Sequence, residues 1–398
     1  MAKGQKPASD IGSRLAVVDI LRGFALTGLF LVHMIESYEL YWKAPDSGPL
    51  GDTVYLLFMG KSFSLLALCF GFSFYVLMER AARKGQDFTA RFAWRLAVLF
   101  AIGFLHSLVY RGEIIQLLSG MGFLLLLFHR VKNNRLLIWI ALLFLAQPLL
   151  WIQMIAAANG AEWANQMPLH YQDQAMDIYV GGDFWQTLHA NLWSGQWPKW
   201  WFMVETGRIM QIMGLYLVGM VLGRMGFFSR LGDFAQERWI GLGLALGAAL
   251  ILYFIRGDLT AGFAAMGYGE AAARELGYIL GSWFELAGMT SWALILCALY
   301  QGAGRVLILP FAPVGRTTLT LYILQSVIFV PIFYHFGLDR WDDWSQATRF
   351  GVGIGAVGIQ MAVAALWLKH FQYGPIEWVW RALTYTTADI PFRKKPAA

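Results

Sequence analysis

Long apolar stretches alternate with short polar segments along almost the whole chain. Ten of these stretches approach the about 20 residues that a helix needs to cross roughly 30 Å of hydrocarbon. Backbone amides in lipid must bond within their own segment, and no stretch shows the alternating pattern of barrel strands, so we expect helices. The predicted spans cover residues 15–35, 52–78, 92–110, 113–129, 135–157, 207–228, 239–255, 277–300, 313–336 and 350–369.

Composition and charge support this all-α, polytopic membrane class. Hydrophobic residues make up 58% of the 398 residues and charged residues only 14%. If the N-terminus is cytoplasmic, ten crossings return the C-terminus to the same side, and most Lys and Arg then face the cytoplasm. The net charge of +6 therefore reflects topology rather than nucleic-acid binding. We expect a multi-pass protein of a bacterial-type cytoplasmic (inner) membrane, in contact with membrane lipids.

The predicted spans divide the chain into five parts. Residues 1–14 form a cytoplasmic tail, residues 15–157 hold the first five spans, and residues 207–370 hold the last five. Residues 158–206 are rich in Trp and acids, which favours a cap of short interfacial helices over the outer leaflet. This cap is either a passive belt or a lid. Residues 371–398 predict an interfacial helix and a basic tail that contacts anionic headgroups.

The first apolar stretch carries Asp19 and Arg22, followed by His33. Charges inside a span are costly and often functional. Asp19 and Arg22 lie three apart, share a helix face and can neutralise one another, so we expect a structural brace or a donor entrance. His33 lies about 21 Å further along a straight helix than Asp19, which excludes direct contact between them.

A second set of polar residues lies in the predicted outer half of the membrane. Its members come from several of the ten spans, and this convergence predicts a polar cavity that opens outward. The set contains His33, Lys61, His106, Glu113, Gln116, Glu205, Arg208, Gln211, Glu285, Gln325, Ser326 and His335.

Several of these residues also have a structural interpretation. Lys61 can neutralise Glu113 or Glu285, because an unpaired lysine at that depth would cost several kcal/mol. Arg208 can pair with the nearby Glu205. A glutamine side chain can form a hydrogen bond that joins two helices. No cysteine or histidine spacing is typical of a metal site, so we expect no metal.

Several segments resemble a known group of membrane proteins. Residues 18–28, 63–71 and 95–115 resemble the YeiB-like proteins, and residues 315–326 with 374–381 look like the C-terminal domain of that group, domain of unknown function family 418. This resemblance implies a topology but no activity.

A more distant resemblance implies chemistry. The spacing of Asp19, Arg22 and His33 is similar to the first helix of acyltransferase family 3, membrane enzymes that move acyl groups onto extracytoplasmic sugars. The resemblance implies that His33 takes part in transfer.

The leading hypothesis is therefore a transmembrane O-acyltransferase with acyl-CoA as donor and an extracytoplasmic lipid or glycan hydroxyl as acceptor. His33 would act as general base or briefly carry the acyl group, and His106 is the alternative base. Glu113 would orient the site or balance its charge. The residues expected to bind substrate are Lys61, Arg208, Gln211, Glu285 and Gln325.

Two other hypotheses stay open. The same polar groups would also suit a transporter or a lipid-binding protein without catalysis, or the chain could be a structural subunit of a membrane assembly. The sequence predicts no firmly bound cofactor. It leaves open whether the protein forms a homo-oligomer and whether the polar cluster is a site or contacts between helices.

Overall fold

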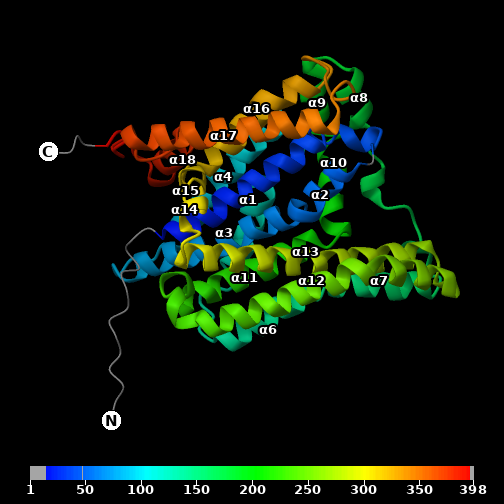
Figure 1. Ribbon diagram of the computed structural model, residues 1–398, viewed down its shortest axis with the longest axis horizontal. Coiled ribbons are helices and arrows are strands. Elements are labelled where there is room, and N and C mark those ends of the chain that lie inside the picture. The colour runs from blue at the N-terminus through cyan, green and yellow to red at the C-terminus, as the bar shows by residue number, and fades with distance from the viewer. Residues whose placement is uncertain (1–14, 47, 395–398) are drawn as a thin grey trace, which may run out of the picture.

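The protein is described by a computed structural model that covers residues 15–46 and 48–394. This part of the chain is all-α, as predicted, apart from one isolated bridge between Phe371 and Arg393. The long helices lie side by side in one bundle, and α18 (Pro375–Tyr385) lies at the same end as the start of α1 (Ala16–Ile35) (Figure 1).

Six segments of the described chain are long and apolar enough to cross a membrane, and a seventh is formed if one bent pair counts as a single span. A chain with this many apolar helices is a multi-pass membrane protein. The six are α1, α2 (Pro49–Phe58) with α3 (Lys61–Ala82), α6 (Asn134–Leu145) with α7 (Pro148–Ala158), α12 (Ala235–Phe263), α13 (Glu270–Gln301) and α17 (Gln346–His370). The bent pair is α10 (Gln196–Glu205) and α11 (Arg208–Met225), which meet at 65°.

The other three predicted spans fall on helices outside this set. They are α4 (Thr89–Ser107), α5 (Ile115–Leu125) and α16 (Thr318–Phe333). The last two are shorter than a spanning helix needs to be. Conversely, α12 and α13 run past their predicted apolar stretches, because a helix can continue with charged residues once it has left the hydrocarbon.

The core of the bundle surrounds α1, whose residues are almost all buried. Its closest neighbour is α15 (Phe311–Arg316). A Cβ atom added to Gly315 would lie 1.7 Å from the Asp19 carbonyl oxygen, and one added to Gly23 would lie 2.0 Å from that of Phe311. These two glycines therefore allow the backbones of α1 and α15 to touch.

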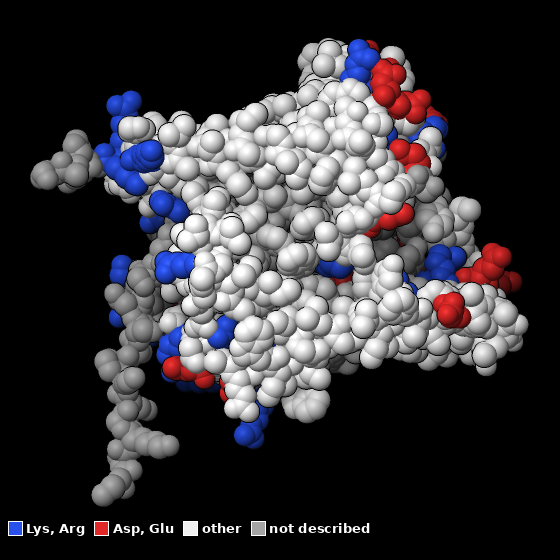
Figure 2. All heavy atoms as spheres, in the orientation of Figure 1, with Lys and Arg blue, Asp and Glu red and all other residues white. Residues whose placement is uncertain are grey.

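The segment between α7 and α11 contains three short α-helices, α8 (Ala175–Gly181), α9 (Phe184–Leu192) and α10. Several of its tryptophans are exposed, including Trp163, Trp185 and Trp193. Figure 2 shows Lys and Arg gathered mainly at the end of the bundle with α18, most visible Asp and Glu at the opposite end, and an almost uncharged band between.

Candidate functional site

The candidate site lies where α4 turns into α5. The buried Glu113 carboxylate closes the start of α5, accepting the backbone N–H of Ile115 and that of Gln116, the latter at 2.9 Å. A carboxylate is favourable there, because the first N–H groups of a helix lack partners within it. Gly103 allows the close approach of α4, since a Cβ atom there would lie 2.7 Å from the Gln116 nitrogen.

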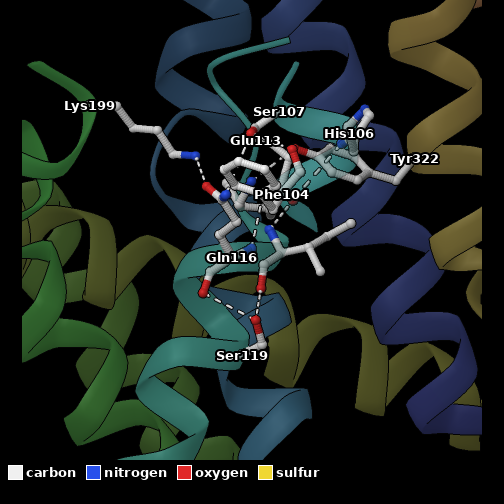
Figure 3. A network of polar contacts seen from close by, with 10 residues as sticks. Phe104, His106, Ser107, Glu113, Gln116, Ser119, Lys199 and Tyr322 are labelled. Carbon is white, nitrogen blue, oxygen red and sulfur yellow. Dashed lines mark hydrogen bonds and ion pairs between the residues drawn. The ribbon is translucent and has the colours of Figure 1, made fainter. Parts of the chain in front are cut away.

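His106, in the last turn of α4, points toward this carboxylate (Figure 3). Its Nδ1 atom lies 3.9 Å from the Glu113 Oε1 atom, which is beyond hydrogen-bond length. The ring is buried, and neither ring nitrogen has a hydrogen-bond partner within the described chain. The edge of the ring packs against Tyr322, with 5.1 Å between ring centroids. Packing therefore holds His106 in place, and neither of its ring nitrogens is engaged by a hydrogen bond from the described residues.

A lysine from the Trp-rich segment reaches the same site. Lys199 of α10 is buried, and its Nζ atom donates to the Gln116 Oε1 atom at 2.7 Å (Figure 3). The Gln116 amide in turn lies 3.4 Å from the Ser107 hydroxyl. Lys199 falls within residues 158–206, the segment predicted to form a surface cap, and was not among the predicted site residues. The available signal was a single cation between Trp197 and Trp200 in an otherwise acidic segment.

His33 lies in the last turn of α1, beside this network but in a different environment. Its ring centroid is 5.4 Å from that of Tyr38 and 5.3 Å from that of Tyr110. Tyr110 also connects His33 to His106, because its backbone N–H donates to the His106 carbonyl oxygen at 3.1 Å. The structure therefore brings the three predicted catalytic residues, His33, His106 and Glu113, into one region, together with Gln116 of the predicted polar set.

The other predicted residues are distributed elsewhere. Arg208 pairs with Glu285 at 3.3 Å rather than with Glu205, whose carboxylate accepts from His170. Lys61 lies near this Arg208–Glu285 pair, where its Nζ atom is 3.3 Å from the Met59 carbonyl oxygen.

The two predicted glutamines connect helices. Gln211 donates to the Ser282 carbonyl oxygen at 3.4 Å, between α11 and α13. Gln325 donates to Gln360 at 2.7 Å, between α16 and α17. Their contacts therefore match the structural interpretation, because an amide in an apolar bundle is stabilised by a partner on the next helix.

Asp19 and Arg22 form the expected brace, with 3.6 Å between the Asp19 Oδ1 and Arg22 Nη1 atoms, and Arg22 also donates to the Ser73 hydroxyl. Both residues line a cavity of about 990 Å³. The cavity walls carry seven arginines and two carboxylates. The arginines are Arg22, Arg80, Arg95, Arg224, Arg230, Arg316 and Arg381, and the carboxylates are Asp19 and Glu377.

The part of this cavity nearest the start of α5 is apolar and reaches the candidate site. Ile114, Ile115, Leu118 and Tyr322 line it. Tyr322 also packs on His106, and its hydroxyl accepts the Ile114 N–H at 3.1 Å. Tyr322 therefore separates the cavity from the site at His106 and Glu113 and contacts both.

Glu377 connects α18 to α16 at the edge of the cavity. Its carboxylate accepts the N–H of Leu319 at 2.7 Å, and the N–H and hydroxyl of Thr320 at 3.1 and 2.5 Å. Burial raises the pKa of Glu377 above its ordinary value of 4.5, although these hydrogen bonds oppose the shift.

This pKa shift predicts a pH-dependent stability. Between the ordinary pKa of 4.5 and the raised pKa of the folded state, folded protein holds more protons at Glu377 than unfolded protein does. Stability should therefore fall as the pH rises through this interval and level off above it. Thermal melting of the purified chain between about pH 4.5 and 8 would show this fall, and Glu377→Gln should flatten it. The exposed Glu237→Gln is the control, and parallel curves for wild type and Glu377→Gln would contradict the prediction.

Two protein families match this chain. Residues 222–387 match the family described as protein of unknown function (DUF418), and residues 14–180 match the catalytic domain of heparan-alpha-glucosaminide N-acetyltransferase. The second match includes His33, His106 and Glu113 but not Lys199.

Similar proteins match over nearly the whole chain. Uncharacterized protein YxaH of Bacillus subtilis is 27% identical over 96% of both chains. Uncharacterized protein YeiB of Escherichia coli is 24% identical over 96% of this chain and 99% of its own. These matches confirm the predicted resemblance to YeiB-like proteins and to family 418, and the acetyltransferase match indicates a distant resemblance to acyl-transferring membrane enzymes.

Proposed function

We propose that this protein is a membrane-embedded acyltransferase. It would take an acyl group from a donor at the basic end of the bundle and pass it to an acceptor hydroxyl at the opposite end. The observation that carries this proposal is the cavity, which begins among arginines and ends at the wall shared with His106 and Glu113. The match to an N-acetyltransferase catalytic domain supports the same reaction class.

The charge distribution supports an orientation. Positive residues prefer the cytoplasmic side, so the end with α18 would face the cytoplasm of an inner membrane, with ten crossings and both termini inside. The cavity would then open toward the cytoplasm. A donor made in the cytoplasm could enter it without crossing the bilayer.

The cavity lining suits a donor with phosphates and an apolar end. Arginine guanidinium groups bind phosphate oxygens through paired hydrogen bonds, and seven of them face only two carboxylates. The apolar far end would hold an acyl chain. Acyl-CoA has both features, and its thioester would lie near Tyr322.

The reaction requires a base at the far end of the cavity. His106 would take the proton of the acceptor hydroxyl while the hydroxyl oxygen attacks the thioester carbonyl carbon. The C–S bond then breaks, and the departing thiolate receives the proton from the His106 imidazolium. Glu113 would stabilise that imidazolium, because its carboxylate is the nearest negative charge. His33, which lies beside His106, would be on the acceptor side.

Thiol release tests this function without an identified acceptor. Purified protein in proteoliposomes would receive [14C]acetyl-CoA and a total bacterial membrane extract, with free thiol and labelled product measured together. We expect equal amounts of thiol and acylated product, with no net uptake of label as free solute. Uptake of label without thiol release would contradict the proposal and would indicate transport.

A further inference from the structure

A second charged cluster lies on the side of the bundle formed by α3, α11, α12 and α13. Its members, which we call the Phe284 cluster, are Lys61, Arg208, Arg256, Phe284 and Glu285. The Lys61 Nζ atom and the Arg256 guanidinium carbon each lie 4.4 Å from the centroid of the Phe284 ring. Arg208 completes the cluster through its 3.3 Å contact with Glu285.

The Phe284 cluster has more positive than negative charge. Among the described residues, Arg208 is its only cation with a carboxylate within 4.0 Å. Glu36 is also within electrostatic reach of Arg208. The cluster therefore holds three cations. One carboxylate, Glu285, is in contact with them, and a second, Glu36, is further away. An excess of positive charge beside hydrocarbon is unfavourable unless an anion compensates it.

Two helix N-termini add to this positive potential. Lys61 begins α3 and Arg208 begins α11, and each follows a glycine with a φ angle of +72°. The Glu285 carboxylate lies against the first of these starts, because a Cβ atom on Gly60 would be 2.0 Å from its carboxyl carbon. The first residue of each helix is therefore a member of the cluster, and the N-terminus of a helix favours anions.

The cluster lies at the level of a membrane surface. In α12 an uninterrupted apolar run, residues 239–255, separates Arg238 from Arg256. At 1.5 Å per residue these two arginines lie about 27 Å apart along the helix, close to the roughly 30 Å thickness of the hydrocarbon core. Arg256 therefore marks the boundary opposite α18. Its neighbours Phe254, Ile255 and Leu259 are exposed and would contact lipid.

We propose that the Phe284 cluster binds the phosphate of an anionic lipid headgroup in the leaflet opposite α18. Arg256, which is half-buried at the lipid-facing surface, would contact the phosphate first. Lys61, which is only 5% exposed, would contact it from inside the bundle. This lipid site does not depend on the acyl transfer proposed above.

Lipid binding by the delipidated, detergent-purified full chain tests this inference. Native mass spectrometry and thermal melting would compare phosphatidylglycerol, phosphatidylcholine and inorganic phosphate. We expect phosphatidylglycerol to bind and raise the melting temperature and the other two to have little effect. The double variant Lys61→Gln with Arg256→Gln should bind phosphatidylglycerol roughly tenfold or more weakly, because it removes two of the three cations of the cluster.

The control is Lys43→Gln with Arg340→Gln, which removes the same charge from two exposed surface pairs. It should bind phosphatidylglycerol as wild type does. If the double variant does not fold, Arg256→Gln alone should still weaken binding, because this side chain has no ion pair to lose among the described residues. Equal binding of both lipids, an equal loss in the control, or equal stabilisation by inorganic phosphate would overturn the proposal.

Discussion

Replacing His106 by Asn should abolish thiol release from acetyl-CoA, with a loss of roughly a hundredfold or more. The imidazole packs on Tyr322, which lines the donor cavity, and its Nδ1 atom lies 3.9 Å from the Glu113 carboxylate. Asn is polar and small enough for the same space but cannot take up a proton near neutral pH. Donor binding should be unchanged, since His106 does not line the cavity. Turnover and acetyl-CoA binding would therefore be measured on the same preparation.

Two further variants make this result specific. His189→Asn removes an exposed histidine of α9 and should leave turnover unchanged. His33→Asn tests the alternative base. If His33→Asn stops thiol release while His106→Asn retains it, His33 is the base and the assignment to His106 is wrong.

Gly315→Ala should destabilise the folded protein by about 3 kcal/mol or more. The added methyl group would lie 1.7 Å from the Asp19 carbonyl oxygen, and backbone cannot move aside as a flexible side chain can. α1 and α15 would have to separate. Because Gly315, Asp19 and Arg22 line the cavity, acetyl-CoA binding should weaken as well. Unfolding in SDS and donor binding would measure the two effects.

The matched control is Gly281→Ala in the middle of α13. A Cβ atom there meets nothing within 4 Å among the described residues, so we expect no loss of stability. Similar stabilities for the two variants would show that α1 and α15 do not pack as closely as described.

The histidine site illustrates how far sequence reasoning reaches. Counting depth along each helix selected His33, His106 and Glu113, which do share one region. The same count selected Gln211 and Gln325, which connect other helices. Depth fixes a position along a helix axis but not the direction in which the side chain points around it. That direction depends on how neighbouring helices pack.

Lys199 and the donor cavity could not be found from local sequence. Lys199 follows Pro198 in a segment whose tryptophans indicate a surface. In the structure α10 meets α11 at an angle of 65°, and the Lys199 side chain reaches Gln116 inside the bundle. The seven arginines of the cavity come from segments scattered between Arg22 and Arg381. In sequence they resemble the ordinary positive charges at cytoplasmic helix ends.

The sequence by itself determined the all-α membrane class and the positions of the apolar helices. Partition into lipid is a sum over neighbouring residues, so a local pattern is sufficient for both. Only the tertiary structure decided that His106 faces Glu113, that Arg208 pairs with Glu285, and that the brace at Asp19 opens onto a cavity. All three depend on how the helices pack against one another, and a local stretch of sequence does not determine that packing.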